Sequence, residues 1–152
     1  MSSTQHTDKI ERMEKSLRYI SHIIKQRGRE ILNNYPITPP QFVALQWLRE
    51  LGDLTIGELS KRMYLAFSTT TDLVDRMEKN ELIIRVRDPK DRRVVRIHLL
   101  DKGKEIINEV IQKRQDYLSE ILTTHTEEEI NALHDSMAQL YEVMKSEEQK
   151  RD

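Results

Sequence analysis

Several residue types are scarce in this chain of 152 residues, which has no cysteine and only four glycines and four prolines. The lack of cysteine excludes disulfide bonds, thiolate zinc sites and thiol-based redox sensing. The small number of glycines and prolines argues against a β-sandwich or a barrel. The composition therefore favours a helical protein.

Long hydrophobic runs are also absent from the sequence. No stretch approaches the roughly 20 apolar residues that a membrane-spanning helix needs. The first ten residues, MSSTQHTDKI, lack the apolar run of a signal peptide. We therefore expect a soluble, cytoplasmic protein with no membrane partner.

Positive charge is in slight deficit overall, since the formal net charge is −1, but it is concentrated in one segment. Residues 85–96 hold six lysines and arginines against two aspartates, a balance of +4. Residues 126–152 hold eight acidic side chains against three basic ones, a balance of −5. We expect the first segment, and not the second, to meet an anionic partner.

Long amphipathic helices are predicted at both ends of the chain. Apolar residues recur at helical spacing over about 8–33 and 101–123, and a capping box of Thr126 with Glu129 opens a last helix. Each helix has one apolar stripe, and the stripes would be buried best in a second layer shared between two chains. We therefore expect a homodimer. The expected helical dimerisation region comprises residues 8–34 and 101–147.

Three shorter helices are predicted between these ends. Capping boxes begin the first two, Thr38 with Gln41 and Thr55 with Glu58, and the third helix starts near Phe67. The hydrophobic period then changes from 3.6 to 2 in LIIRVRD and RVVRIHL, which predicts two strands around the turn PKDR.

Three helices followed by a basic two-stranded hairpin are typical of a winged helix-turn-helix. The predicted fold class is therefore mainly α, with a β wing. We expect residues 38–100 to form this DNA-binding lobe within a single chain of residues 1–152.

The helix that starts near Phe67 is the candidate recognition helix, because the second helix of a helix-turn-helix lies in the major groove. Its buried stripe runs from Thr70 to Met77, which leaves a hydroxyl-rich face outside. Hydroxyls bond phosphates, and the methyl group of threonine can touch that of thymine. The alternative is a solvated, threonine-rich face. The residues expected to contact double-stranded DNA here are Ser68, Thr69, Thr71 and Arg76.

Two aspartates on the same helix would repel phosphate. We expect Asp75 to hold an arginine of the hairpin, or Arg76, rather than to touch DNA. Asp72 could accept a hydrogen bond from cytosine or hold a neighbouring arginine, and its role stays open.

The tip of the hairpin is the second candidate DNA contact. A narrow minor groove attracts inserted arginines, and a turn delivers such a side chain without the bulk of a helix. We expect Lys90, Arg92 and Arg93 to contact DNA, with Asp88 or Asp91 bracing the arginine stems. The alternative is that the charge only blocks edge pairing of the strands.

The segment LSKRMYLAFSTTTDLVDRMEKNELIIRVRDPKDRRVVRIHLLDKG resembles the core of the MarR family of transcriptional regulators. The match lies in the end of the recognition helix and in the wing from Asp88 to Gly103, and the flanking helices fit the plan of the whole family chain. The resemblance implies a homodimer whose terminal helices interlock and whose two winged-helix lobes read a pseudo-palindrome. It also implies that Arg92 enters the minor groove and that Arg93 and Asp91 have a structural or DNA-binding role.

The sequence departs from the family pattern at three positions. Asn80 stands where the family has glycine, and we expect it to end the recognition helix in a left-handed conformation, which asparagine tolerates. Leu100 replaces a threonine before the next helix, and we expect Asp101 to take over the cap. Asp72 stands where a basic or polar residue is common, which bears on base preference rather than on the fold.

Many members of the family respond to small aromatic ligands, so such an effector is a candidate partner. Neither a cofactor nor a metal is expected, since His125 and His134 lack helical ligand spacing. No nucleophile elbow, phosphate loop or carboxylate constellation indicates an enzyme. The candidate lining of an effector pocket is Tyr19, His22, Tyr35, Phe42, Trp47 and Tyr64.

These observations predict a sequence-specific DNA-binding regulator, and specifically a repressor. The competing interpretation is a winged-helix module that docks its basic hairpin on an acidic protein. A protein-binding face would be more apolar than the hydroxyl-rich surface around Ser68.

Overall fold

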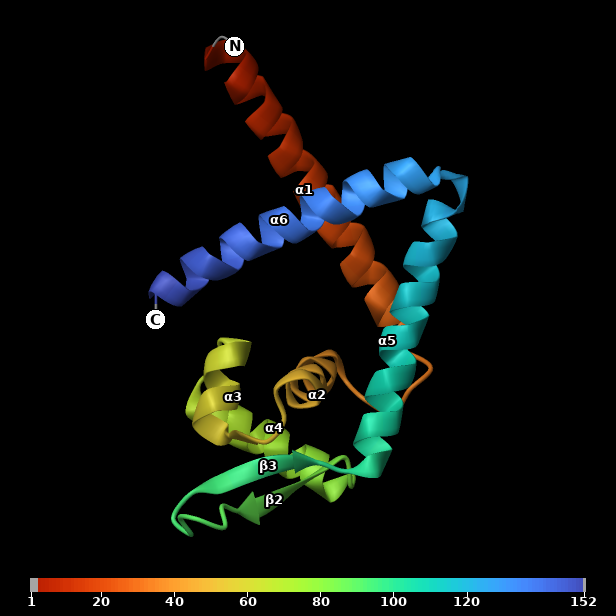
Figure 1. Ribbon diagram of the computed structural model, residues 1–152. Helices are drawn as coiled ribbons and strands as arrows, with labels where there is room; N and C mark the ends of the chain where they lie inside the picture. The colour runs from red at the N-terminus through yellow and green to blue at the C-terminus, as the bar shows by residue number, and fades with distance from the viewer. Residues whose placement is uncertain (1–2, 152) are drawn as a thin grey trace. The chain divides into compact units, whose positions relative to one another are not determined.

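The computed structural model describes residues 3–151, and Figure 1 labels most of its helices and strands. The helices are α1 (Ser3–Leu32), α2 (Pro39–Leu51), α3 (Ile56–Met63), α4 (Phe67–Lys79), α5 (Asp101–Ile121) and α6 (Glu127–Arg151), with a short 3₁₀ turn at Leu122–Thr124. The strands are β1 (Leu54–Thr55), β2 (Ile83–Arg87) and β3 (Val95–Leu99). The chain forms two compact units, one ending at Arg114 and the other beginning at Gln115.

Helices α2, α3 and α4 gather beside the β2–β3 hairpin, which confirms the predicted winged-helix fold (Figure 1). Both capping boxes predicted for this lobe are present. The Thr38 hydroxyl accepts from the backbone N–H of Gln41 at 3.3 Å, and the Thr55 hydroxyl accepts from that of Glu58 at 3.1 Å. The largest fully buried side chains of this lobe are Leu45, Leu59, Val74, Met77, Leu82, Ile83 and Ile97.

The sheet has three strands in the order β1-β3-β2, one more than the sequence predicted. Strands β2 and β3 pair antiparallel, with Ile83 opposite Leu99. The unpredicted strand β1 is only two residues long, too short for any hydrophobic period to show. It places the buried Leu54 opposite the buried Ile97 and so ties the hairpin to the helical core.

Helix α4 ends through a left-handed residue, but that residue is Glu81 and not Asn80 as predicted. Asn80 has φ −88° and ψ 7°, whereas Glu81 has φ 62°. The N–H of Leu82 donates to the Met77 carbonyl and that of Glu81 to the Glu78 carbonyl, both at 3.0 Å. This is the Schellman pattern, whose left-handed position falls one residue after the helix cap. The prediction was wrong by one residue because Asn80 itself serves as that cap.

The start of α5 packs tightly on the lobe. A Cβ atom on Gly103 would collide with the backbone carbonyl of Leu82, so only glycine permits this approach. Further along the helix, Ile107 and Val110 are buried in the core. Asp101 is the first residue of α5 rather than its cap, and its carboxylate therefore lies at the positive end of the helix dipole.

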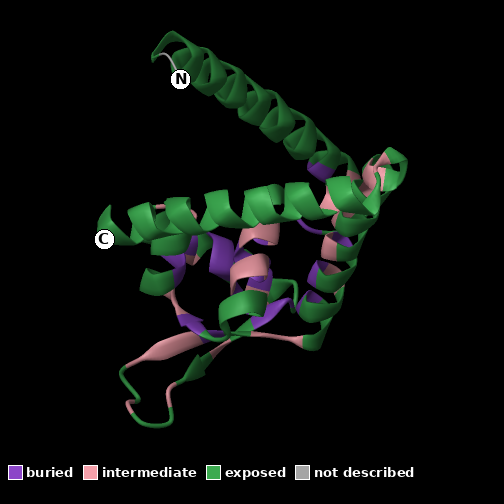
Figure 2. Cartoon of the chain, turned by 45° about the horizontal axis from the view of Figure 1, so that its top comes forward, coloured by how far each residue is buried: buried purple, intermediate pink, exposed green. Residues whose placement is uncertain are grey.

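An apolar stripe in each unit lies outside the core. Helix α1 begins at Ser3, before the predicted residue 8, and α1 and α6 are exposed along most of their length (Figure 2). The predicted division into residues 8–34 and 101–147 for dimerisation and 38–100 for DNA binding stays a prediction. The large apolar side chains that are exposed on these helices include Ile10, Met13, Leu17, Ile20 and Ile23 of α1 and Leu133, Met137, Leu140, Tyr141 and Met144 of α6.

Candidate nucleic-acid interface

Helix α4 divides into a buried and an exposed face, as its sequence predicted. Thr70, Leu73, Val74 and Met77 are buried. Within residues 3–151, the exposed side chains of Ser68, Thr69 and Arg76 have no hydrogen-bonding partner. Those three side chains are therefore available to an external ligand.

Thr71 differs from its neighbours on the same helix. Its side chain is half-buried, and its hydroxyl donates to the Phe67 carbonyl at 3.0 Å. The donor of this hydroxyl is thus already used, and its remaining contributions to a partner are an acceptor oxygen and a methyl group.

The N-terminus of α4 lacks the side-chain cap that α2 and α3 both have. Its cap residue is Ala66, whose side chain has no hydrogen-bonding atom. The first N–H groups of an α-helix have no partner inside the helix and point toward its positive end. Their orientation suits phosphate, which supports the assignment of α4 as the helix that approaches DNA.

Asp88 builds the turn at the hairpin tip. One of its carboxylate oxygens accepts from the backbone N–H groups of Lys90 at 2.8 Å and Asp91 at 3.2 Å. The other accepts from the guanidinium of Arg96 at 2.9 Å. The bond from Arg96, followed by that from the backbone of Lys90, holds the pKa of Asp88 below its ordinary value. The turn is therefore organised by an ionised carboxylate at neutral pH.

Arg85 joins the base of the hairpin to α4. Its guanidinium lies 2.6 Å from an Asp75 carboxylate oxygen and 2.7 Å from one of Glu78. The backbone N–H of Arg85 also donates to Glu78, at 2.9 Å. Asp75 thus contacts a hairpin arginine, one of the two partners that the sequence suggested for it. Arg85 therefore neutralises two carboxylates of α4, the candidate recognition helix.

Arg96 lies on β3 opposite Val86, and it joins the strands of the hairpin to the turn and to α3. Besides the contact with Asp88, its guanidinium lies 3.4 Å from Glu58, the residue that completes the capping box of α3. The hydrogen bond to Asp88 is the main cause that raises the pKa of Arg96. Arg85 and Arg96 therefore hold the hairpin against two different helices.

The cations nearer the tip are engaged differently. The Arg87 guanidinium donates to the Arg92 carbonyl at 2.8 Å, which ties one strand to the turn. Arg93 pairs with Asp91 at 3.1 Å, although its side chain is 90% exposed. The side chains of Lys90 and Arg92 are exposed, and neither has a partner in the part of the chain that the structure describes. Among the cations of residues 85–96, Lys90 and Arg92 are therefore the two whose side chains make no hydrogen bond or ion pair with a described protein atom.

Sequence reasoning counted all six hairpin cations together and did not separate these roles. It named Lys90, Arg92 and Arg93 as contacts but gave no role to Arg85 or Arg96. Opposite charges far apart in the chain, such as Glu58 and Arg96, are brought together only by the fold. An available signal was Asp75, because a carboxylate on a DNA-facing helix repels phosphate unless a cation pairs with it.

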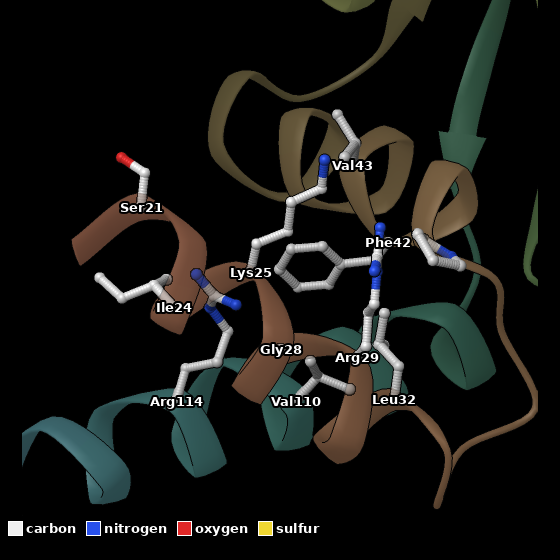
Figure 3. Close-up of a pocket in the computed structure, with 11 residues that line it drawn as sticks. Ser21, Ile24, Lys25, Gly28, Arg29, Leu32, Phe42, Val43, Val110 and Arg114 are labelled. Atoms are coloured by element: carbon white, nitrogen blue, oxygen red, sulfur yellow. The ribbon is translucent and has the colours of Figure 1, made fainter. Parts of the chain in front are cut away.

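A cavity of about 460 Å³ lies between α1, α2 and the first part of α5 (Figure 3). Its lining combines the apolar side chains of Leu32, Phe42 and Val110 with the basic side chains of Lys25, Arg29 and Arg114. The Arg114 guanidinium lies 5.5 Å from the centre of the Phe42 ring, a cation–π contact.

Of the six residues predicted to line an effector pocket, Phe42 lines this cavity and the other five do not, and their role toward an effector stays a prediction. Trp47 instead packs under the Arg62 guanidinium at 5.3 Å, and Tyr64, which is 83% exposed, adopts a left-handed conformation at the end of α3. The remaining three that do not line it are Tyr19, His22 and Tyr35.

Among residues 3–151 there is no cluster of three or more side chains able to hold a metal ion. Over the same residues, no helix combines the length and apolarity needed to cross a bilayer. The candidate nucleic-acid interface consists of helix α4 and the β2–β3 hairpin with its charged side chains.

A three-helix lobe with an exposed helix N-terminus and a basic wing defines a winged helix-turn-helix DNA-binding protein. The sequence model of the MarR family matches residues 37–95. The chain belongs to the MarR family, which confirms the resemblance seen in its motifs. The family is one of transcription regulators and not of enzymes, as the sequence predicted.

Individual relatives extend the match beyond the lobe. The chain is 66% identical over 133 residues to the HTH-type transcriptional regulator YsmB of Bacillus subtilis, covering 88% of this chain and 91% of that protein. It is 33% identical over 115 residues to the HTH-type transcriptional repressor MdtR of the same organism, covering 76% and 74%. A solved MarR family protein from Bacillus stearothermophilus has a TM-score of 0.88 at 59% identity, covering 91% and 97%.

Proposed function

We propose that this MarR-family regulator acts as a homodimeric repressor that occupies a pseudo-palindromic operator in double-stranded DNA. The observation that carries the proposal is the division of charge on the wing. The fold neutralises Arg85 and Arg96, while Lys90 and Arg92 stay free at the tip. Free cations on a projecting turn suit the negative potential of a minor groove. A regulator of this kind acts where the chromosome lies, in the cytoplasm.

Each base-reading element has its own contribution in this proposal. Ser68, Thr69 and Thr71, with Arg76, contact the major groove from α4. Lys90, Arg92 and Arg93 contact the backbone and minor groove from the wing. Asp75 and Asp88 do not touch DNA but brace the two arginines that hold the hairpin, at 2.6 and 2.9 Å. Asp91 likewise braces Arg93, at 3.1 Å.

The exposed apolar stripes support the homodimer. Side chains such as Met13 and Ile20 of α1 and Met137 of α6 are more than half exposed. Apolar stripes of this length on a soluble helix are normally buried against another element. We propose that a second copy of the chain covers them, with residues 8–34 and 101–147 as the dimerisation region and 38–100 as the DNA-binding lobe. The repressor role is further supported by the 33% identity to the repressor MdtR.

The cavity at Phe42 supports a small-molecule effector that releases the operator. Its volume of about 460 Å³ falls within the range of ligand pockets. An apolar lining that also contains Lys25, Arg29 and Arg114 suits a small aromatic carboxylate better than a neutral or cationic compound. Thermal unfolding with and without benzoate, on wild type and on Arg114→Gln, tests this part. A benzoate-dependent rise in Tm that is smaller in the variant is expected, and equal shifts would contradict it.

Binding selection from random duplexes near physiological salt tests the function itself, with wild type and Arg92→Ala side by side. We expect wild type to enrich a pseudo-palindrome with half-sites about one helical turn apart, and the variant to bind it more weakly. Arg92→Lys serves as the matched control, because it retains the charge but not the guanidinium fork. If no sequence is enriched, the operator proposal is wrong and docking of the basic hairpin on an acidic protein becomes the better account.

A further inference from the structure

Phe67 is an exposed aromatic ring at the first position of α4, and no residue between 3 and 151 makes a ring contact with it. Its exposed fraction is 63%. By contrast, Phe42 and Trp47, on α2, are half-buried beneath the guanidinium groups of Arg114 and Arg62. Those two rings therefore pack against other side chains of the protein, whereas most of Phe67 is exposed to solvent.

Phe67 lies at the edge of the buried stripe of α4, about 100° around the helix from the exposed Ser68, and Thr71 lies between the two. At 100° per residue it lies one turn before Thr71 on the same side of the helix, next to the exposed Ser68. The Thr71 hydroxyl is spent on the Phe67 carbonyl at 3.0 Å. The ring of Phe67 and the methyl group of Thr71 therefore offer apolar surface near the N-terminal end of the proposed recognition helix.

The chemistry of the major groove offers this apolar surface one matching feature. Base edges there carry hydrogen-bond donors and acceptors, and the apolar exception is the C5-methyl group of thymine. A phenyl ring has no donor for phosphate, so its contribution to binding comes from burying apolar surface. The polar neighbours Ser68 and Thr69 argue against a protein partner, whose contact face would be apolar around an aromatic anchor.

We propose that Phe67 reads the C5-methyl group of a thymine in each half-site, and so determines specificity at a position that hydrogen bonds do not read. This inference rests on the proposed operator binding. It predicts a preference for a methylated pyrimidine, thymine or 5-methylcytosine, over the same base without its methyl group.

The test compares operator duplexes that differ by single methyl groups, using the duplex that wild type enriches in the selection above. Each thymine of a half-site is replaced in turn by deoxyuridine, which pairs identically but lacks the methyl group. For wild type we expect one position at which the replacement weakens binding about fourfold, since burying one methyl-sized group contributes about 0.8 kcal/mol. Replacement in both half-sites should weaken binding roughly fifteenfold.

Three variants decide whether Phe67 is the residue responsible. Phe67→Ala should bind the thymine and deoxyuridine duplexes equally, whereas Phe67→Leu, which keeps an apolar side chain, should retain part of the preference. Leu51→Ala truncates another exposed apolar side chain, at the end of α2, and should leave the preference unchanged. Circular dichroism verifies that each variant is folded.

The outcomes separate this inference from the proposed function. Sequence-specific binding with the same deoxyuridine penalty in wild type and Phe67→Ala would overturn the reading of Phe67 and leave the regulator intact. Sequence-specific binding with no deoxyuridine penalty at any thymine would do the same. A failure of wild type to enrich any sequence would overturn both.

Discussion

The strands of the wing, which form its base, and the turn at its tip carry similar numbers of cations, but these cations are paired in different ways. At the base, Arg85 and Arg96 each lie within 3.4 Å of two carboxylates that belong to α4, α3 or the turn. At the tip, Lys90 and Arg92 have no such partner among residues 3–151. A count of positive charges therefore does not measure a DNA-binding surface. The cations at the base form ion pairs within the protein, whereas those at the tip remain available to a ligand.

Removal of a tip cation should have the largest effect, and it should act on DNA binding. Arg92→Ala should lower the affinity for the selected operator about thirtyfold or more, because each such contact contributes at least about 1 kcal/mol and a dimer loses two of them. Its thermal stability should stay within about 0.5 kcal/mol of wild type, since the side chain is exposed and unpartnered. Fluorescence anisotropy and thermal unfolding measure the two effects. An unstable variant with unchanged affinity would reverse the roles assigned to tip and base.

Removal of a base cation should act mainly on stability. Arg85→Gln leaves Asp75 and Glu78 without their partner, and we expect a loss of about 1–2 kcal/mol in the free energy of unfolding. The value is kept low because the Asp75 side chain is 58% exposed to solvent. Urea denaturation measures it.

A variant that also replaces both carboxylates, Arg85→Gln with Asp75→Asn and Glu78→Gln, serves as the control for Arg85→Gln. It should recover part of the stability, because no uncompensated charge remains. If the triple variant is no more stable than the single one, the ion pairs are not what Arg85 contributes.

The connection between α4 and β2 contains a residue in a left-handed backbone conformation. Glu81 has φ 62°, a conformation that costs a residue with a Cβ atom about 1–2 kcal/mol. Glu81→Gly should therefore stabilise the protein, by about 0.5–1 kcal/mol after the extra entropy of glycine in the unfolded chain is counted. Asn80→Gly is the matched control and should not stabilise, because Asn80 has φ −88°. Equal effects of the two on Tm would contradict this assignment.

The smallest expected effect is the pH dependence of the turn. The hydrogen bond from Arg96 lowers the pKa of Asp88 in the folded protein, so the contribution of Asp88 to stability is complete above the unfolded pKa of about 4. It is lost as the pH falls through the lower, folded value. The backbone amide resonances of Lys90 and Asp91 should therefore move only in that acid range and not near neutrality. In Asp88→Asn this transition should be absent, and its persistence would assign it to another group.

The sequence predicted those parts of the fold that depend on neighbouring residues. Capping boxes at Thr38 and Thr55 and the buried stripe of α4 are local patterns, and the structure confirms them. The position of the left-handed residue was missed by one because two adjacent residues end α4 and only the backbone geometry distinguishes them. Strand β1 was missed because its two residues are held by pairing with β3, a contact distant in sequence.

The candidate site could be predicted only in part for the same reason. The face of α4 follows from helical period, and the basic turn is visible in the letters PKDRR. The partners of Arg85 and Arg96 depend on how α3, α4 and the hairpin pack, which no local pattern encodes. The cavity wall likewise mixes α1, α2 and α5, so aromatic residues chosen from the sequence matched it only at Phe42.

The salt dependence of operator binding tests the central claim most directly, because each phosphate contact made by a cation adds about 0.9 to the slope of log K against log salt concentration. We would measure that slope for wild type, Arg92→Gln and Arg96→Gln on the selected duplex. The account predicts a slope smaller by roughly 2 for Arg92→Gln, since a dimer loses two such contacts, and a nearly unchanged slope for Arg96→Gln. Equal reductions in both variants, or a larger one for Arg96→Gln, would show that the base cations also meet phosphate and would contradict the division between base and tip.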